Sequence, residues 1–418
     1  MPRQRVYGAR RLLVAIAALA LSAACSAGRP AAQPPPESRV EPQVLTHPPP
    51  APDGSLAIAT IFPAVGRYGS SGIQSLNGAR LAIEDVNRAG GVHGRHLALL
   101  EYRTGSYFLD AREAARRAAS AGAVAIVGSN SSDLSMAIAE EAEARHLVQI
   151  SNVSTAQDLT WDPATGRSRA YVFRVCATDV AMGGLLATFA RDTLGARRAA
   201  VLYEVGRTYS ARLARSFVER FRDAAAGRVA AEFFYLALET DFRDQLRAVK
   251  AFGPDVLFLP ASFTDATLIA GQAKGLGLHA TLLGADGWSN PLLFKLGGPA
   301  APAYFVDHCS PTPAFSERYE RVFGQPAQGC RAALAYDAAR AVAAGLEALG
   351  PLRDPGSHLA DTRQKLRDAM GALDFAGVTG RVRFDRYGDR RIGVAVEEVL
   401  PRPEGLPETR LRGWVGER

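Results

Sequence analysis

The stretch Val124-Ala125-Ile126-Val127 is an apolar run of strand length that passes directly into a glycine and the polar segment 129–133. Val256-Leu257-Phe258-Leu259 is a second run of the same kind. Strands that are apolar at every position are buried on both faces, as in parallel sheets covered by helices. These two runs therefore predict an α/β protein built on parallel strands.

The segments around these runs alternate between short apolar stretches and longer amphipathic ones. The predicted strands comprise residues 56–62, 97–102, 123–127, 147–150, 171–175, 199–203, 229–235 and 256–259. The predicted helices comprise residues 72–87, 110–120, 133–145, 180–193, 209–224, 242–252 and 265–274. Strands that alternate with helices of this length form right-handed βαβ units. Because the alternation is too long for one sheet of ordinary size, we expect two doubly wound lobes.

The first 24 residues have the features of a secretory signal. Four arginines precede the apolar run 12–21, which is shorter than the roughly 20 residues of a membrane span. The string Leu21-Ser22-Ala23-Ala24-Cys25 resembles the lipobox of bacterial lipoproteins, which implies cleavage before Cys25 and a lipid on its sulfur. The alternative is an ordinary signal with a chance cysteine. Residues 25–53 are rich in proline and predict an extended tether.

Composition and charge predict a soluble globular body on this tether. Hydrophobic residues make up 47% of the chain and charged residues 22%, which is ordinary for globular proteins. The net charge of +7 falls to +3 without the four arginines of the first 24 residues, and so weak an excess argues against a nucleic-acid partner. We expect an extracytoplasmic lipoprotein, in the periplasm or at the cell surface, which contacts the membrane through its lipid.

Three cysteines follow the lipobox, namely Cys176, Cys309 and Cys330. None belongs to a Cys-x-x-Cys pair, so the sequence signals neither a zinc site nor thioredoxin-like chemistry. A disulfide is permitted outside the cytoplasm. We favour the pair Cys309–Cys330 because both residues flank predicted element ends in one part of the chain, and the sequence leaves the other pairings open.

The sequence lacks the motifs of several common enzyme classes. It has no Gly-x-Ser-x-Gly elbow, no phosphate-binding Gly-x-x-x-x-Gly-Lys-Ser/Thr loop, no Gly-x-Gly-x-x-Gly after a strand and no His-Glu-x-x-His. We therefore expect a protein that is not an enzyme and that uses neither a metal nor a cofactor.

Polar residues follow several predicted strands, and doubly wound sheets bind ligands at the carboxyl ends of their strands. Ser132 opens a helix, where free N–H groups and hydroxyls suit a carboxylate; the simpler interpretation is N-capping by Ser132 or Asp133. Thr155 lies in a hydroxyl-rich segment after the next strand, and Tyr209 opens another helix. Asp286 lies among glycines and is suited to an ammonium group, or is merely a turn residue.

Several motifs also occur in the order known from one family. They are Tyr68-Gly69, Asn77-Gly78-Ala79, the run 85–95, Val172-Phe173-Arg174-Val175-Cys176, Ala335-Tyr336-Asp337-Ala338, and the run 375–380 with Phe384-Asp385. On these motifs, the chain from about Leu56 to Val396 resembles the leucine/isoleucine/valine-binding type of ABC-transporter substrate-binding protein.

This resemblance implies the type I periplasmic-binding-protein fold, with two α/β lobes, a hinge of three strands, and the ligand in the cleft between the lobes. We expect lobe 1 to comprise residues 54–176 and 310–380. We expect lobe 2 to comprise residues 177–309 and 381–418.

The resemblance further implies which residues contact the ligand. It assigns these contacts to Tyr68, Ser132, Val153 and Thr155 in lobe 1, and to Tyr209, Phe263 and Asp286 in lobe 2. Ser132, the backbone at Val153 and Thr155 would hold a carboxylate, Tyr68 would line the cleft, and Asp286 would hold an ammonium group. Two positions depart from the family pattern, because Phe263 replaces a common tyrosine and Val153 is bulkier than the usual alanine or glycine.

Together these features predict a monomeric receptor that captures an amino acid or a related small carboxylate and presents it to an ABC permease in the membrane. One alternative is a ligand-sensing lipoprotein that signals to a regulatory partner without transport. Another is a structural envelope lipoprotein with a vestigial cleft, and an enzyme is the least supported.

Overall fold

The computed structural model describes residues 46–223, 226–290, 292–298, 302–351, 358–400 and 407–416. The predicted signal and Cys25 lie outside these residues, as does most of the predicted tether. In the described ranges, no helix is both long and apolar enough to cross a membrane.

Lobe 1 is built on a parallel sheet of five strands in the order β2-β1-β3-β4-β7. The strands are β1 (Leu56–Pro63), β2 (Leu97–Thr104), β3 (Ala125–Gly128), β4 (Val148–Ser151) and β7 (Val172–Arg174). The intervening helices are η1 (Gly66–Tyr68), α1 (Gly69–Arg88), α2 (Phe108–Ser120), α3 (Ser132–Ala144) and η2 (Gln157–Leu159). Every residue of β1, β3 and β4 is buried, which agrees with the largely apolar sequences of β1 and β3, whereas β4 also buries the polar residues Gln149 and Ser151. A small hairpin, β5 (Trp161–Asp162) and β6 (Arg167–Ser168), projects from this lobe.

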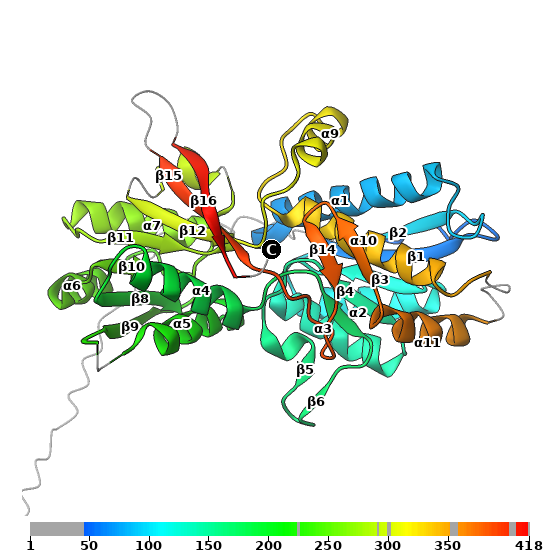
Figure 1. Ribbon diagram of the computed structural model, residues 1–418, viewed down its shortest axis with the longest axis horizontal. Helices are drawn as coiled ribbons and strands as arrows, with labels where there is room; N and C mark the ends of the chain where they lie inside the picture. Colours follow the sequence, from blue (N-terminus) through cyan, green and yellow to red (C-terminus); the bar gives the residue numbers. More distant parts are fainter. Residues whose placement is uncertain are drawn as a thin grey trace, which may run out of the picture. The chain divides into compact units, whose positions relative to one another are not determined.

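Two late helices, α10 (Arg331–Glu347) and α11 (Leu359–Met370), return to lobe 1 and share its core with β1 and β3. In Figure 1 they lie, in yellow and orange, beside the blue strands of the N-terminal region. The hairpin of β13 (Asp374–Gly377) and β14 (Gly380–Arg383) follows them.

Lobe 2 contains a sheet of seven strands in the order β16-β15-β12-β11-β10-β8-β9. The strands are β8 (Arg198–Glu204), β9 (Val229–Tyr235), β10 (Val256–Phe258), β11 (Thr281–Gly284), β12 (Ala303–Asp307), β15 (Val394–Leu400) and β16 (Glu408–Val415). The helices are α4 (Asp179–Asp192), α5 (Thr208–Phe221), α6 (Arg243–Phe252), α7 (Phe263–Gly275), η3 (Asp286–Trp288) and α8 (Leu292–Lys295). β15 and β16 run antiparallel to their neighbours, so the expectation of wholly parallel sheets is wrong at this edge.

The chain passes between the two sheets three times, after β7, after β12 and after β14. The second passage contains α9 (Pro313–Phe323), and a disulfide encloses it by joining Cys309 to Cys330 with an S–S distance of 2.06 Å. This is the pairing that the sequence favours. Cys176 is a free thiol and is buried.

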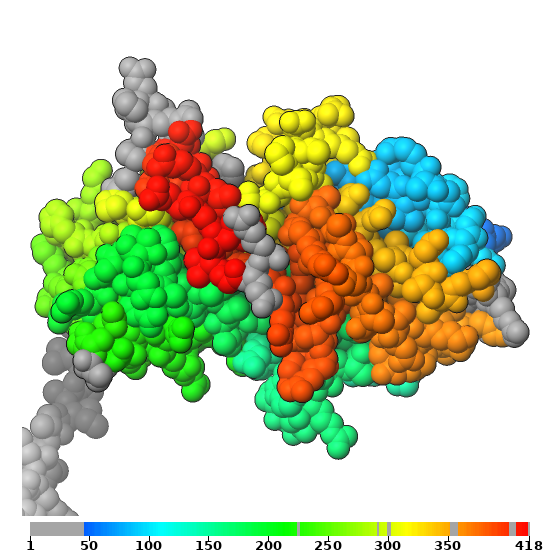
Figure 2. All heavy atoms as spheres, in the orientation of Figure 1, coloured from blue at the N-terminus to red at the C-terminus, as the bar shows by residue number. Residues whose placement is uncertain are grey.

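The last part of the chain contributes to both lobes. Figure 2 shows the red C-terminal strand on one lobe and the orange segment that includes β13 and β14 on the other. The predicted polar residues follow the carboxyl ends of four strands. These strands are β3 and β4 in lobe 1, and β8 and β11 in lobe 2.

Candidate functional site

Ser132 connects two polar segments at the carboxyl ends of β3 and β4. It is the first residue of α3, whose N-cap is Ser131, and no side chain caps this helix. The Ser132 hydroxyl instead accepts a hydrogen bond from the Ala156 backbone N–H at 3.3 Å. N-capping by Ser132 or Asp133 is therefore wrong, and Ser132 lies beside the segment that holds Thr155.

The segment after β4 is held rigidly from beneath. The guanidinium of the fully buried Arg174 donates hydrogen bonds to the carbonyls of Ser154, at 3.1 Å, and Ala156, at 2.7 Å. The same guanidinium pairs with Asp389 in the third passage between the lobes, at 2.6 Å. Because both carbonyls flanking Thr155 are hydrogen-bonded to Arg174, the backbone that carries Thr155 is held in place.

Several buried polar atoms in this region are without hydrogen-bond partners among the described residues. They include Ser129 Oγ, Asn130 Oδ1, Asn152 Oδ1 and Thr155 Oγ1. Leaving a buried polar group unpaired costs about 1–3 kcal/mol, and most such groups in folded proteins are paired. A polar guest that hydrogen-bonds to these atoms would recover that free energy.

Tyr209 and Asp286 form a pair on lobe 2. Tyr209 is the second residue of α5, after β8, and Asp286 begins η3, after β11. The tyrosine hydroxyl donates to Asp286 Oδ1 at 2.8 Å and accepts from the Gly287 backbone N–H at 3.1 Å. These two predicted residues, 77 positions apart in the sequence, therefore present one acidic group.

The Asp286 carboxylate is buried and remains ionised. Burial by itself raises its pKa, but the facing His308 and the charge of Arg331 outweigh burial and hold the pKa below its usual value. His308 Nε2 lies 3.6 Å from Asp286 Oδ2. A negative charge at this position suits a cationic group of a ligand.

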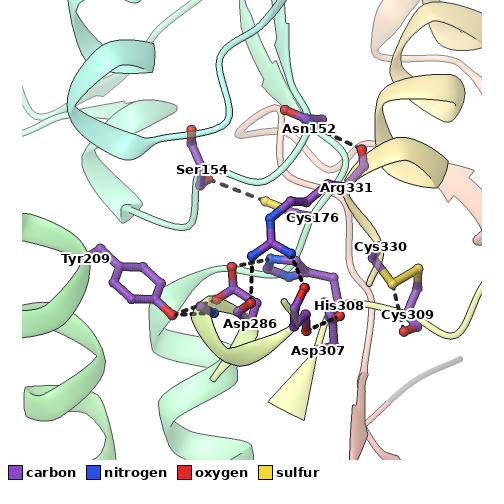
Figure 3. A network of polar contacts seen from close by, with 12 residues as sticks. Asn152, Ser154, Cys176, Tyr209, Asp286, Asp307, His308, Cys309, Cys330 and Arg331 are labelled. Carbon is purple, nitrogen blue, oxygen red and sulfur yellow. Dashed lines mark hydrogen bonds and ion pairs between the residues drawn. A yellow bond between two sulfur atoms is a disulfide. The ribbon is translucent and has the colours of Figure 1, made fainter. Parts of the chain in front are cut away.

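Arg331 links the two lobes next to this carboxylate. It is the first residue of α10, in lobe 1, and its guanidinium donates to the carbonyls of Asp286, at 2.7 Å, and Ser289, at 2.9 Å, in lobe 2. Its own carbonyl accepts a hydrogen bond from the Asn152 side chain at 3.1 Å. Figure 3 shows Arg331 between Asn152 and Asp286.

Tyr68 meets lobe 2 through another arginine. The guanidinium carbon of Arg207 lies 5.5 Å from the centre of the Tyr68 ring and 5.2 Å from that of Tyr209. Both tyrosines are half-buried. This cation between the two rings brings Tyr68, from lobe 1, into the same neighbourhood as Tyr209.

Val153 and Phe263 are placed differently from the other predicted residues. The Val153 side chain belongs to the apolar core of lobe 1. Phe263 is the first residue of α7 and packs against an apolar cluster of lobe 2 that contains Trp288. Each follows a strand, but what the structure shows of their side chains is apolar packing.

Sequence reasoning missed Arg207, Arg331 and His308. Arg207 stands at the same strand–helix junction as Tyr209, so the rule that selected Tyr209 could have found it. Arg331 and His308 adjoin the second passage between the lobes, where no strand was predicted. In the described ranges, His, Cys, Asp and Glu side chains form no group of three that could hold a metal ion.

Comparison with known proteins connects this geometry to one family. The sequence profile of the periplasmic binding protein family matches residues 55–394. A leucine-, isoleucine-, valine-, threonine- and alanine-binding protein from Pseudomonas aeruginosa is 25% identical over 343 residues, which cover 80% of this chain and 87% of the relative. A Leu/Ile/Val-binding protein homologue from Brucella melitensis is 23% identical, over 72% of this chain and 80% of the relative.

Solved structures share the fold. The leucine-binding protein LivK from Thermotoga maritima superposes with a TM-score of 0.75 and 27% identity, over 86% of this chain and 99% of that one. A solute-binding protein from R. palustris in complex with benzoate superposes with a TM-score of 0.72, over 87% of this chain and 97% of that one. Because the second is only 19% identical, its likeness concerns the fold alone.

Proposed function

The chain belongs to the periplasmic binding protein family, and from this premise we propose that it is the extracytoplasmic solute-binding receptor of an ABC importer. Its ligand is an amino acid or a related small carboxylate. The matched relatives are binding receptors and not enzymes, and their names record amino-acid ligands. We further propose that Cys25 carries the lipid anchor, that the receptor is a monomer, and that its partner is a membrane permease.

One observation carries the choice of ligand class, namely the ionised Asp286 carboxylate that Tyr209 holds on lobe 2. Across Arg331, lobe 1 offers the amide oxygen of Asn152 and, next to Ser132, the hydroxyl of Thr155, both without a hydrogen-bond partner in the described part of the chain. An anionic group on one wall and hydroxyls on the other complement a zwitterion. The carboxylate of the ligand would contact Ser132 and Thr155, and its ammonium group would contact Asp286.

The free energy required is within reach of these contacts. Charge-assisted hydrogen bonds contribute about 1.5–3 kcal/mol each, and micromolar affinity corresponds to roughly 8 kcal/mol. Because the contacts come from both lobes, the ligand binds the closed arrangement more tightly than an open one. Binding thus shifts the hinge equilibrium toward closure, and the closed form is the one that a permease would recognise.

The variant Asp286→Asn tests the proposal because it keeps the shape of the side chain and removes its charge. Isothermal titration calorimetry would compare leucine and alanine with benzoate, which has a carboxylate but no ammonium group. We expect the variant to bind the amino acids at least tenfold more weakly, and the loss for benzoate to be much smaller.

Asp244→Asn is the matched control, because the Asp244 side chain on α6 is 93% exposed. It should bind all three compounds as the parent protein does. Equal affinity of Asp286→Asn and the parent for the amino acids would remove Asp286 from the site. Absence of binding across a broad panel of amino acids and small carboxylates would overturn the proposed function.

A further inference from the structure

Arg207 is a largely buried cation to which the proposed ligand contacts give no role. It is the N-cap residue of α5, directly after the turn that follows β8, and its side chain is only 12% exposed. Its guanidinium lies over the rings of Tyr68, from lobe 1, and Tyr209, from lobe 2. It therefore adjoins both walls of the proposed ligand site.

The other buried arginines show what a structural guanidinium looks like in this chain. Arg174 donates hydrogen bonds to three backbone carbonyls, to Thr160 and to Asp389. Arg363 bonds to the carbonyls of Ala119 and Ala123, and Arg390 bonds to three carbonyls and to Thr379. The N–H donors of each of these guanidinium groups are thus engaged in hydrogen bonds within the fold.

The guanidinium of Arg207 is not engaged in such hydrogen bonds among the described residues. Among the described residues it donates no hydrogen bond, and its Nη1 atom is buried without a hydrogen-bond partner. Its nearest carboxylate oxygen is Glu204 Oε2, at 3.9 Å, and Arg67 approaches the same oxygen more closely, at 3.3 Å. A group with five N–H donors is thus held in place by ring contacts and a long ion pair, with its donors available.

We propose that Arg207 is the specificity-determining residue of the cleft and that it binds a second carboxylate of the ligand. This inference rests on the proposed function and narrows it, because the preferred guest becomes an acidic amino acid or a similar compound with two carboxylates and one ammonium group. The planar guanidinium fork matches a carboxylate with two parallel hydrogen bonds. The guanidinium of Arg207 is already largely shielded from water, so it loses little hydration when it pairs with a ligand carboxylate.

The rings of Tyr68 and Tyr209 add a geometric condition. Arg207 touches one ring from each lobe, so its donors and the lobe 1 wall come together only when the lobes meet. A second carboxylate would then be bound in the closed form and lost in the open form. The competing interpretation is that Arg207 merely holds the lobes together, without contacting the ligand.

Pairs of acids and their amides separate these interpretations, because each pair differs in charge and hardly in shape. Calorimetry on the purified full-length protein would compare L-aspartate with L-asparagine and L-glutamate with L-glutamine. We expect the acid to bind at least tenfold more tightly than the amide in one or both pairs. In Arg207→Gln, this ratio should fall to about one, and in Arg207→Lys it should take an intermediate value.

Arg67→Gln is the matched control, because Arg67 is joined to lobe 2 by ion pairs with Glu204 and Asp265 and lies over neither tyrosine ring among the described residues. This variant should bind acids and amides more weakly by the same factor, so the ratio of their affinities should stay the same. Thermal unfolding of each variant checks that it folds. If Arg207→Gln does not fold, the ratio in the parent protein decides the question by itself.

A parent ratio near one overturns the inference, and so does a loss in Arg207→Gln that is equal for acids and amides. If amino acids bind in a way that depends on Asp286 but show no preference for the acids, this inference fails and the proposed function stands. If none of the amino acids or small carboxylates binds, both fail together.

Discussion

Asp179 is a buried carboxyl group beside the candidate site, and its raised pKa predicts a contribution to stability that depends on pH. Its backbone N–H donates to the Thr155 carbonyl at 2.8 Å, and its Oδ1 accepts from Val180 N at 2.8 Å. Oδ2 has no hydrogen-bond partner among the described residues. Burial raises the pKa of Asp179 from 3.8 to about 6, although Arg174 and Arg212 oppose the shift. Between about pH 4 and pH 6, the carboxyl group of Asp179 therefore keeps its proton in the folded state and has lost it in the unfolded state.

We expect the free energy of unfolding of Asp179→Asn to rise relative to that of the parent protein as pH rises. The folded pKa lies above the unfolded one, so the stability tied to the proton is complete below about pH 4 and is lost by about pH 6. A shift of this size corresponds to at most about 3 kcal/mol. The asparagine cannot ionise, so its free energy of unfolding relative to the parent should increase between pH 4 and pH 7. Denaturant titrations at both pH values measure this difference, and a difference that is constant with pH would contradict the prediction.

At the scale of single residues, the candidate positions that the sequence offered were polar residues that follow a predicted strand. Tyr209 and Asp286 were found in this way, and they share a hydrogen bond. Arg331 could not be found, because its role depends on α10 returning to lobe 1 after more than 150 residues in lobe 2 and its connections. The availability of Arg207 is likewise invisible in the sequence, because it depends on which acceptors the fold places within reach.

The disulfide is the element-scale feature with the clearest consequence. It closes the passage between β12 and α10, with a sequence separation of 21 between Cys309 and Cys330. Closing a loop of this length removes entropy from the unfolded chain and is worth about 3 kcal/mol. We expect the double variant Cys309→Ser/Cys330→Ser to lose about this much stability, and reduction of the parent protein to have the same effect. Arg331 follows Cys330 directly, so ligand affinity should fall as well.

Denaturant titrations with and without a reducing agent measure this effect. The double variant serves as its own control, because Cys176 is a free thiol, the proposed lipid occupies the sulfur of Cys25, and the reducing agent should therefore not change the variant. Identical unfolding midpoints for the oxidised and the reduced parent protein would show that the cross-link does not stabilise the fold.

Element boundaries were predicted well where apolar runs were continuous, as in β1, β3 and β10. β16 was not predicted, because its sequence alternates charged and apolar residues without a continuous run and follows a proline-rich segment. It is a strand because β15 provides an edge on which it can pair. A strand that forms because it pairs with a neighbouring edge strand has no distinctive local sequence pattern, so it is hard to predict from sequence alone.

At the scale of the whole two-lobed body, ion pairs join the two lobes, and we expect them to favour the closed arrangement. Arg67, in η1 of lobe 1, lies 3.3 Å from Glu204 Oε2 and 3.7 Å from Asp265 Oδ2, both in lobe 2. Arg212 and Asp158 form another pair between the lobes. The two carboxylates that Arg67 contacts are largely buried, whereas Arg67 itself is 33% exposed, so solvent and salt weaken these pairs in part.

We expect Arg67→Gln to favour the open arrangement of the unliganded protein. Partly exposed pairs of this kind are worth about 1 kcal/mol together, which is roughly a fivefold change in the ratio of open to closed molecules. Small-angle X-ray scattering at low salt should give a larger radius of gyration for the variant than for the parent, and the two should converge as salt screens the parent's ion pairs. Arg243→Gln is the control, because Arg243 pairs with Asp241 on the surface of lobe 2 alone. A radius of gyration that is the same for all three proteins at low salt would show that contacts other than the Arg67 pairs hold the lobes together.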